Sequence, residues 1–396
     1  MRKLSVEKAT DLEGKRVLLR CDFNVPYDSQ GEISDTRRID ESLRTIRFLI
    51  DKNAKIILCS HFRRPHGVFN PEMSLGKVAE CLSIKLGKTV KMSNDVVGDS
   101  AVSLTSSLQN GEICLLENLR FEIGEENNDL NFAKKLASLA DVYVGDAFGV
   151  CHREHASIVS VPRILPSYCG FLIQKEVKMI SSIVDNPMRP FISILGGAKV
   201  SDKIGVIENL VDKVDSFIIG GGMTYTFMSA LGYSIGDSIC EHSKISLAKD
   251  ILALAREKKV EFILPIDCKL GKEYDPDTET KIVDSDKICE GWQGLDIGPK
   301  SIELFSNKLR EASSVVWNGP VGVSEWPAFS EGTFSLARVL AESKAKTVVG
   351  GGDVAAAVKS AGVAENMYHI STGGGASLMF LEGKQLPGIV ALPNDL

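Results

Sequence analysis

The chain has 396 residues, enough for two or three domains at roughly 150 residues each. Its 46 basic and 52 acidic residues give a formal net charge of −6, which argues against binding nucleic acid or an anionic membrane over a broad face. Hydrophobic residues at 44% and charged residues at 25% are typical of globular enzymes rather than disordered chains. Without an apolar N-terminal stretch or a run of about 18 apolar residues, we expect a soluble, cytoplasmic protein with no export signal.

Short apolar runs alternate with amphipathic segments along most of the chain. In the first half, strands are predicted at 16–23, 55–60, 113–118 and 142–148, and helices at 42–52, 75–86 and 130–140. In the second half, strands are predicted at 190–195, 216–219, 261–266, 314–317, 347–349 and 368–371, and helices at 204–214, 245–258, 302–312, 333–342 and 354–361. Continuous apolar strands between amphipathic helices are typical of parallel sheets covered on both faces. We therefore predict an α/β fold with two doubly wound domains.

The two halves differ in composition. Twelve of the sixteen arginines precede residue 170, whereas glycine-rich strand ends cluster after residue 190. A domain boundary is expected near 162–185, where a stretch with prolines meets the helix-like segment 171–183. The nine cysteines are scattered without a CxxC pair, which predicts reduced thiols rather than a zinc or disulfide framework.

Glycine-rich turns follow several predicted strands of the second half, at 196–197, 220–222, 319–322, 350–352 and 373–375. In open α/β sheets the ligand crevice lies beyond the carboxyl ends of the strands. Glycines there permit close backbone approach, and helix N-termini offer amide donors to phosphate. One such turn says little, because tight turns need glycine anyway, but several in one half favour a nucleotide site. None matches GxxxxGKS/T or GxGxxG, so neither a P-loop nor a dinucleotide fingerprint is predicted.

Charged residues beside these turns fit a nucleotide with a metal ion. Lys199 and Lys203 flank the start of a predicted helix, an end that lysine normally avoids, so they suggest bound phosphates; solvent-facing lysines are the alternative. Asp353 at another helix start is either an N-cap or a Mg²⁺ ligand on spacing alone. Glu325 could bond ribose hydroxyls or be an ordinary exposed acid.

Arginines recur at or just beyond the predicted strand ends of the first half, with histidines beside two of them: Arg20, Arg38, Arg64, Arg120 and Arg153, with His61 and His152. A single arginine is most often surface charge, but a set at one sheet edge predicts an anion pocket, because guanidinium groups bind phosphate and carboxylate bidentately. Asp22 and Asn24 could hold hydroxyls of a small polyanion. His152 and His155 have metal-like spacing but no third nearby ligand, so no metal site is predicted there.

No sequence motif resembles a nucleophile with an adjacent base, which disfavours a phospho-enzyme. The pattern instead predicts that one domain holds a small phosphorylated acid and the other a nucleotide with Mg²⁺. Phosphoryl transfer between such ligands needs little covalent help and much neutralisation of charge.

These motifs together resemble the phosphoglycerate kinase family from residue 16 to the C-terminus. The matching segments of the first half are Arg20-Cys-Asp-Phe-Asn-Val-Pro26, Leu116-Glu-Asn-Leu-Arg-Phe121 and Asp146-Ala-Phe-Gly149 with His152-Arg153. Those of the second half are Gly196-Gly-Ala-Lys-Val200, Asp202-Lys-Ile204, Leu295-Asp-Ile-Gly-Pro299, Trp317-Asn-Gly-Pro320, Gly350-Gly-Gly-Asp353 and Ser371-Thr-Gly-Gly-Gly-Ala-Ser377. So many long matches in the same order leave little room for chance.

The resemblance implies reversible phosphoryl transfer from 1,3-bisphosphoglycerate to Mg-ADP, giving 3-phosphoglycerate and ATP in glycolysis. The implied substrate-binding residues are Asp22, Phe23, Asn24, Arg38, His61, Arg64, Arg120, His152 and Arg153. The implied nucleotide-binding residues are Gly197, Ala198, Lys199, Lys203, Gly221, Gly294, Asn318, Pro320, Glu325, Gly351, Gly352, Asp353 and Val354, with Asp353 on Mg²⁺. The implied catalytic residues are Arg38, Lys199 and Gly374, and Arg38 would stabilise the moving phosphoryl group.

The resemblance also implies a monomer of two Rossmann-like domains. They would be a substrate domain at 1–168, a hinge helix at 169–185, a nucleotide domain at 186–371 and a segment at 372–396 that returns to the first domain. The implied partners are the small-molecule substrates and ADP or ATP, with no nucleic acid and no membrane.

Four departures distinguish the chain from the family pattern. Phe62-Arg63 stands where Leu-Gly is usual, so Arg63 adds a charge beside the substrate pocket. Val354 removes a usual hydroxyl near the phosphates, Ser324 replaces a usual Phe, and Met379 a usual Glu.

Every charged residue assigned to chemistry is retained, so we expect an active enzyme. Two other classes stay open: a different ATP-dependent acid kinase, and a nucleotide-binding protein of this fold without turnover. Intact Arg38 and Lys199 argue against the second.

Overall fold

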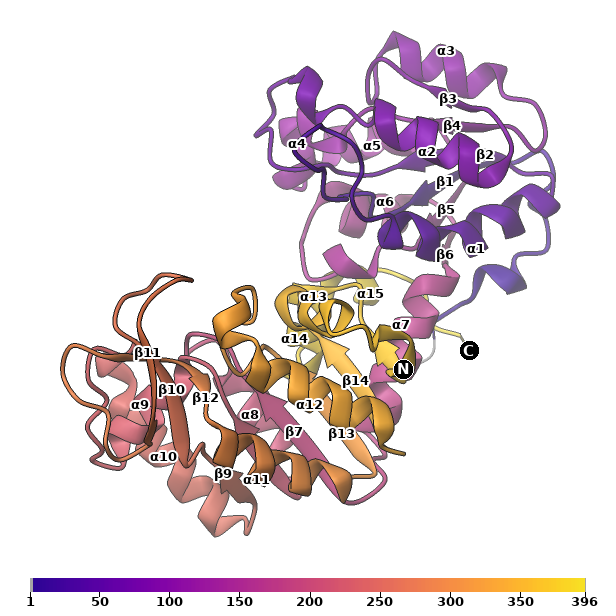
Figure 1. The fold of residues 1–396 in the computed structure, drawn as a ribbon. Helices are drawn as coiled ribbons and strands as arrows, with labels where there is room; N and C mark the ends of the chain where they lie inside the picture. The colour runs from indigo at the N-terminus through magenta and orange to yellow at the C-terminus, as the bar shows by residue number, and fades with distance from the viewer. Residues whose placement is uncertain (1–2, 396) are drawn as a thin grey trace. The chain divides into compact units, whose positions relative to one another are not determined.

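The computed structural model describes residues 3–395, which form two compact units (Figure 1). Unit 1 consists of Met1–Val177 together with Gln385–Leu396, and unit 2 of Lys178–Lys384. Helix α7 (Phe171–Val184) carries the chain from unit 1 into unit 2, and the segment after Lys384 brings it back. No helix within residues 3–395 has the length and apolar character needed to cross a membrane.

Unit 1 is built on a six-stranded parallel sheet in the order β3-β4-β2-β1-β5-β6. The strands are β1 (Arg16–Arg20), β2 (Lys55–Cys59), β3 (Val90–Met92), β4 (Ile113–Leu115), β5 (Val142–Gly145) and β6 (Ser167–Cys169). The helices are α1 (Arg37–Asp51), α2 (Gly76–Leu86), α3 (Asp99–Ser107), α4 (Ile123–Glu126), α5 (Leu130–Ser138), α6 (Val161–Ile164) and α15 (Pro387–Val390). The predicted strands and helices are confirmed. β3, β6, α4, α6 and α15 were not predicted, because segments of three or four residues show no periodicity. The nine-residue α3 was not predicted either.

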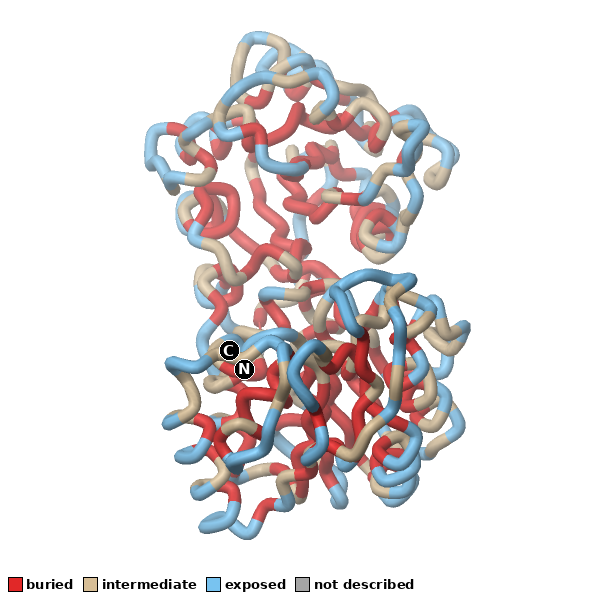
Figure 2. The backbone as a smooth tube through the Cα atoms, turned by 60° about the vertical axis from the view of Figure 1, so that its left-hand side comes forward, coloured by how far each residue is buried: buried red, intermediate tan, exposed pale blue. Residues whose placement is uncertain are grey.

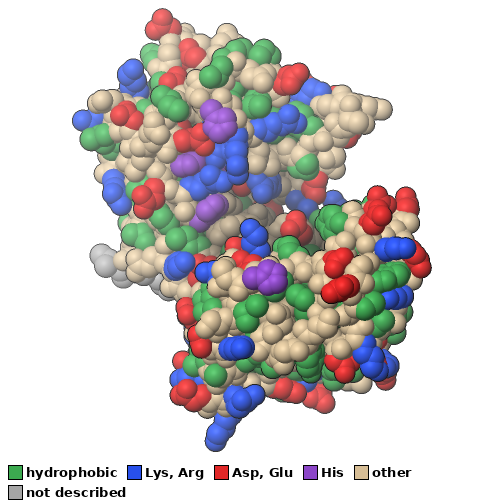
Figure 3. Space-filling model, turned by 90° about the vertical axis from the view of Figure 1, so that its left-hand side faces the viewer, with side chains coloured by type: hydrophobic (Ala, Val, Ile, Leu, Met, Phe, Trp, Pro, Cys, Tyr) green, Lys and Arg blue, Asp and Glu red, His purple; other side chains and the backbone are tan. Residues whose placement is uncertain are grey.

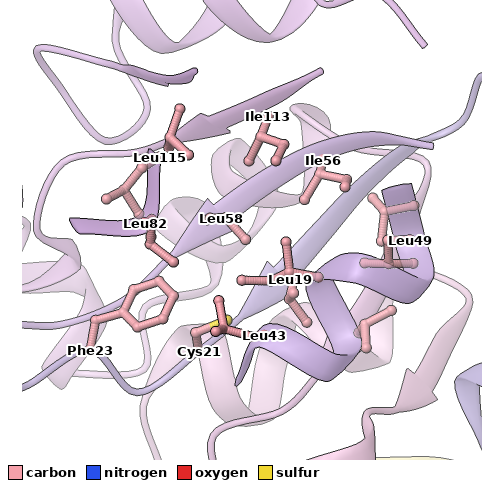
Figure 4. Close-up of a cluster of buried hydrophobic side chains, with 14 of the residues drawn as sticks. Leu19, Cys21, Phe23, Leu43, Leu49, Ile56, Leu58, Leu82, Ile113 and Leu115 are labelled. Atoms are coloured by element: carbon pink, nitrogen blue, oxygen red, sulfur yellow. The ribbon is translucent and has the colours of Figure 1, made fainter. Parts of the chain in front are cut away.

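Alternate residues of the unit 1 strands point into one hydrophobic cluster beneath α1 and α2 (Figure 4). Leu19 and Leu58 of the central strands meet Leu43 of α1 and Leu82 of α2, and all four are buried. The opposite face is covered by the π-helical segment 156–160, where Tyr143 donates from its hydroxyl to the Ser157 carbonyl at 2.8 Å. Figure 2 shows buried backbone running through the centre of the unit. Burial on both faces explains why these strands are apolar without alternation.

The start of α7 is fixed by Asp146, a fully buried residue of the Asp146–Gly149 motif. Its carboxylate accepts hydrogen bonds from the Leu172 amide at 2.8 Å and the Thr45 hydroxyl at 2.5 Å. A Cβ at Gly170 would lie 2.3 Å from the Asp146 carboxyl carbon, so only glycine fits before the helix. Burial raises the pKa of Asp146 to about 7, against the opposing effect of these donors. The motif therefore determines where the connecting helix begins.

Unit 2 repeats the architecture with a six-stranded parallel sheet in the order β15-β14-β13-β7-β8-β9. Its strands are β7 (Phe191–Leu195), β8 (Ser216–Ile219), β9 (Glu261–Ile263), β13 (Ser314–Asn318), β14 (Lys346–Gly350) and β15 (His369–Ile370). Its helices are α8 (Ile204–Leu210), α9 (Met223–Ala230), α10 (Ile245–Glu257), α11 (Pro299–Arg310), α12 (Glu331–Glu342), α13 (Gly352–Ser360) and α14 (Gly374–Leu381). The doubly wound prediction is confirmed for both units; α9 and α14 were not predicted.

A second sheet of unit 2 is antiparallel and was not predicted. It has three strands in the order β11-β10-β12, namely β10 (Asp267–Gly271), β11 (Thr280–Asp284) and β12 (Gln293–Ile297). Tyr225 and Met228 of α9 pack against Cys268 and Leu270 of this sheet. No residue of β11 is fully buried, so the strand lacks the continuous apolar run by which the parallel strands were found.

Candidate active site

The first part of the candidate site lies at the carboxyl ends of β1, β2 and β5 in unit 1. Asp22, directly beyond β1, is 4% exposed, and both of its carboxylate oxygens accept from Arg38 Nη1 at 3.0 Å. Arg38 Nη1 also donates to the Asn24 carbonyl at 3.2 Å. Arg38 is the second residue of α1, so the helix start places its guanidinium group beside the strand end. The structure thus brings together three residues that the sequence analysis assigned to one anion site.

Arginine and histidine side chains dominate this edge, and Figure 3 shows such side chains gathered over one face of unit 1. Five buried nitrogens have no hydrogen-bond partner within residues 3–395, namely Nε and Nη2 of Arg120, Nδ1 of His152, Nε of Arg153 and Nδ1 of His155. Arg120 Nε lies 3.2 Å from Glu126 Oε1, in an ion pair without hydrogen-bond alignment. A buried polar group without a partner costs free energy. This set therefore favours a ligand with several acceptor oxygens.

The histidines of this edge are held neutral. Burial lowers the pKa of His61 well below its ordinary value, and the charges of Arg20, Arg120, Arg38 and Arg153 lower it further. Burial and neighbouring arginines also lower the pKa of His155, to about 3. Without an anion, additional positive charge at this edge is strongly disfavoured.

We expect anion binding to be coupled to proton uptake at His61. A bound polyanion offsets the arginine charges, so the pKa of His61 rises in the complex. The complex then holds more protons than the free protein below the ordinary histidine pKa of about 6.5. By linkage, the uptake of a proton at His61 makes the anion bind more tightly as the pH falls through that range. Titration calorimetry in buffers of different ionisation enthalpy measures the uptake.

The phosphate of the ligand also exchanges protons when it binds. The contribution of His61 is therefore the difference in proton uptake between the wild type and His61→Gln. The exposed His66 provides the control, and His66→Asn should keep the wild-type uptake. Equal uptake in wild type and His61→Gln would contradict the coupling.

Three residues that the sequence analysis assigned to the unit 1 site differ from the others in burial: two are fully buried and one is exposed. Phe23 is fully buried in the hydrophobic cluster, and its amide donates to the Ser60 hydroxyl at 2.8 Å, so its side chain does not face the site. Arg64 is exposed. Arg20, which the sequence analysis grouped with the pocket arginines, is fully buried and donates to the Ser157 hydroxyl at 2.9 Å. Arg20 is therefore a buried residue of the unit interior and is not exposed to a ligand.

The second part of the candidate site is a cleft of about 980 Å³ within unit 2. The assigned residues that line it are Gly197, Ala198, Gly221, Gly294, Pro320, Glu325 and Asp353. The sequence analysis missed several other lining residues, among them Ile239, Tyr274 and Val323. Tyr274 packs its ring on Trp326 at 4.5 Å between centroids. It lies in the loop between β10 and β11, and no sequence signal connected that loop with the glycine turns.

The glycines at this cleft fall into two groups. A Cβ at Gly196 would lie 2.0 Å from the Pro320 carbonyl oxygen, and one at Gly294 would lie 1.7 Å from the Tyr225 hydroxyl, so these glycines are required by packing. Gly352 has no atom within 4 Å of a Cβ position, and a Cβ at Gly374 would first meet the Gly352 nitrogen at 3.6 Å. The starts of α13 and α14 therefore lie together with open space beside them. Helix N-termini in this arrangement can bind phosphate.

Lys203 and Asn318 connect the strand ends of unit 2. Lys203 is 9% exposed and donates from Nζ to the Asn318 side-chain oxygen, while Asn318 Nδ2 donates to the Gly350 carbonyl at 2.8 Å. Burial lowers the pKa of Lys203. Lys199 is exposed on the loop after β7. The carboxyl ends of these strands thus carry one exposed lysine and one buried lysine that is held by Asn318.

Asp353 and its neighbour Val354 occupy the first turn of α13. The N-cap position is Gly351, with φ +108°, and no side chain caps the helix, so the N-cap alternative for Asp353 is not observed. Asp353 is exposed and lines the cleft, which leaves its carboxylate available to a cation. The Val354 side chain is fully buried in the core of unit 2, so only its backbone amide can serve a ligand. Within residues 3–395, no cluster of three or more His, Cys, Asp or Glu side chains suits a metal ion.

Buried arginine and histidine nitrogens without a hydrogen-bond partner in unit 1, and open helix-start amides in unit 2, suit an α/β kinase for a small phosphorylated acid. The profile described as Phosphoglycerate kinase matches residues 7–384. The chain therefore belongs to the phosphoglycerate kinase family, whose members are phosphotransferases.

Individual relatives agree with this family assignment. The chain is 52% identical to a phosphoglycerate kinase of Prochlorococcus marinus (strain MIT 9312) over 402 residues, covering 100% of both chains. It is 52% identical to that of Dictyoglomus turgidum over 385 residues, covering 97% of both. Among solved structures, phosphoglycerate kinase from Coxiella burnetii is 39% identical with a TM-score of 0.88, and that from Pyrococcus horikoshii is 31% identical with a TM-score of 0.82; each comparison covers 98% of both chains.

Proposed function

We propose that the chain transfers a phosphoryl group reversibly from 1,3-bisphosphoglycerate to ADP, giving 3-phosphoglycerate and ATP as a step of glycolysis. The observation that carries this proposal is the set of buried nitrogens without a hydrogen bond on Arg120, His152, Arg153 and His155, beside a family match over nearly the whole chain. Such a set fits a small acid with both a carboxylate and a phosphate, because each oxygen can accept from a different fixed donor.

In unit 1, Asp22 and Asn24 would orient the glycerate hydroxyl, and the donors of His61, Arg120 and Arg153 would bind its charged groups. His152 and Arg64 would complete the set, while Phe23 would contribute only backbone. Arg38 is held by Asp22 through Nη1 alone, and it makes no hydrogen bond from Nη2 or Nε within residues 3–395. Its free donors would engage the phosphoryl group in transit.

In unit 2, the amides at the starts of α13 and α14, including those of Gly351, Gly352, Val354 and Gly374, would bind the nucleotide phosphates. Lys199 and Lys203 would add positive charge near the transferred group, with Lys203 oriented through Asn318. The cleft residues Gly197, Ala198, Gly221, Gly294, Pro320 and Glu325 would surround the nucleoside.

A magnesium ion fits the exposed carboxylate of Asp353, since hard oxygen ligands suit Mg²⁺ and one or two carboxylates plus phosphate oxygens normally hold it. When bound, such an ion neutralises phosphate charge during transfer. Asp353 would orient the ion from the first turn of α13, next to the amides that bind the phosphates.

A coupled assay with 3-phosphoglycerate and Mg-ATP tests the proposed reaction directly. Turnover with 3-phosphoglycerate and none with other small acids is expected. Preference for another acid would indicate a different acid kinase, and nucleotide binding without turnover on any acid would indicate a non-catalytic protein.

Gly352→Ala should weaken nucleotide binding without harming the fold. A methyl group here meets no protein atom, and alanine favours a helix over glycine by about 1 kcal/mol. Displacing a phosphate from backbone donors costs more, since a hydrogen bond to a charged group is worth about 1.5–3 kcal/mol. We expect the nucleotide dissociation constant to rise roughly tenfold or more, with a melting temperature at least as high as that of the wild type. Gly76→Ala, at the first residue of α2, should change neither quantity; unaltered affinity in Gly352→Ala would rule out phosphate at this helix start.

We further propose that the chain works as a monomer in the cytoplasm and that α7 acts as a hinge during turnover. The acid-binding and nucleotide-binding residues belong to different units, so transfer requires them to meet. The nine cysteines are all free, which suits a reducing compartment. Small-angle scattering should give a monomer mass and a smaller radius of gyration when both ligands are added. An unchanged radius in an active sample would contradict a hinge.

A further inference from the structure

Arg63 is unusual in both backbone and side chain. Its φ is +52°, in the left-handed region that non-glycine residues rarely adopt. The same backbone is tied to two proposed substrate-binding residues. The Arg63 amide donates to Asn24 Oδ1 at 2.9 Å, and its carbonyl accepts from Arg120 Nη1 at 2.5 Å. The residue is therefore fixed at the edge of the unit 1 pocket in a conformation that glycine would adopt at lower cost.

The Arg63 side chain is exposed but held in place. Its guanidinium carbon lies 5.4 Å from the centre of the Tyr27 ring and 5.2 Å from that of Phe62, and the two rings are 4.9 Å apart. Burial raises the pKa of Tyr27, and the positive charge of Arg63 opposes that rise, which is consistent with the proximity of the two groups. A guanidinium group this close to aromatic rings is attracted to their faces, and this attraction favours the observed side-chain position of Arg63.

No carboxylate neutralises this guanidinium group within residues 3–395. Three acids influence Tyr27 electrostatically, namely Glu32, Glu117 and Glu80. Glu32 pairs with Lys77 at 2.7 Å, Glu117 accepts from the Ser74 hydroxyl at 2.7 Å and the Leu75 amide at 3.0 Å, and Glu80 forms no ion pair with Arg63. Arg63 makes no hydrogen bond from its side chain in the same range. Its donors, five in every arginine, thus face solvent from a fixed position.

We propose that Arg63 is an additional anion-binding residue at the rim of the unit 1 pocket, which captures the phosphorylated acid from solution. This inference rests on the proposed function, and it assigns Arg63 to substrate capture rather than to the transition state. Burial is the main cause of the lowered pKa of His61, and the arginines that add to it are Arg20, Arg120, Arg38 and Arg153. Arg63 is not among these arginines, and its side chain is exposed. An outer charge should accelerate association and tighten binding in a manner that salt screens.

The test compares Arg63→Asn with Arg63→Lys. Asparagine tolerates the left-handed conformation and removes the charge, whereas lysine retains the charge. Arg63→Asn should raise KM for 3-phosphoglycerate about two- to fivefold, the range for an exposed charge pair, with little change in kcat. It should also reduce the dependence of kcat/KM on ionic strength, and Arg63→Lys should keep most of that dependence. Lys259→Asn, another exposed cation at positive φ (+58°), serves as the control and should change neither.

A double-mutant cycle with Tyr27→Leu checks that the ring support matters. Removing the ring should weaken binding by itself and should shrink the effect of Arg63→Asn. Melting temperatures identify any variant that fails to fold. An unchanged KM and salt dependence in folded Arg63→Asn would overturn the proposal.

The proposed function is judged separately, by wild-type turnover of 3-phosphoglycerate. If the wild type is inactive, calorimetric binding of 3-phosphoglycerate to wild type and Arg63→Asn still decides the role of Arg63. Equal affinity, or no binding to either protein, would refute it.

Discussion

Arg38→Ala should lower kcat by roughly 10³–10⁵, the contribution of arginines to comparable phosphoryl transfers. Negative charge spreads over the equatorial oxygens of the moving group, and a fixed guanidinium that engages them mainly in the transition state raises turnover more than affinity. Arg38 meets the geometric requirement, because Asp22 holds one of its nitrogens with two contacts of 3.0 Å. The dissociation constant for 3-phosphoglycerate should change far less than kcat, and titration beside steady-state kinetics separates the two.

Arg37→Ala is the matched control. Arg37 adjoins Arg38 in α1, but its Nε pairs with Asp35 at 2.8 Å and its side chain is about half exposed. The structure therefore directs the two arginines differently, and Arg37→Ala should leave kcat and affinity nearly unchanged. Similar small effects in both variants would reduce Arg38 to surface charge. An inactive Arg37→Ala would mean that the catalytic role had been assigned one residue too far along the chain.

Asp353→Ala should lower kcat/KM for Mg-ATP on the order of 10²–10⁴, because a bound metal contributes several kcal/mol of charge stabilisation and each tenfold in rate is about 1.4 kcal/mol. Half-maximal activity should require more Mg²⁺ than in the wild type. The affinity for metal-free nucleotide should persist, since the helix-start amides are intact. Because Asp353 is exposed and caps no helix, its removal should leave the melting temperature unchanged.

Glu365→Ala, which removes another exposed acid of unit 2, controls for the loss of negative charge. Its kinetics and its Mg²⁺ requirement should match the wild type. If Asp353→Ala keeps the wild-type Mg²⁺ requirement, the metal is held elsewhere.

The pattern of apolar residues was sufficient to predict those strands that are buried on both faces. The strands around Leu19 and Ile194 are apolar because both faces of each sheet are covered, and that burial is visible in the sequence as an uninterrupted run. The start of α1 was not predicted, because the expected helix began at residue 42, whereas α1 begins at Arg37. The antiparallel strand Thr280–Asp284 has no such run, so the small sheet to which Gly294 belongs was found only in the structure.

The sequence by itself determined the two doubly wound domains, the family, and the separation of an arginine-rich half from a glycine-rich half. Tertiary structure decided what individual residues can do, because a side chain's direction depends on contacts between distant segments. The side chains of Phe23 and Val354 are buried in the packed core. Gly294 lies against Tyr225, so a Cβ would not fit there, whereas Gly352 has open space beside it. Packing also turned one of two adjacent arginines toward Asp22 and the other toward Asp35. The sequence shows which charged and polar residues follow each strand. Only the folded structure shows which of their hydrogen-bond donors are not used by other protein groups and can bind a ligand.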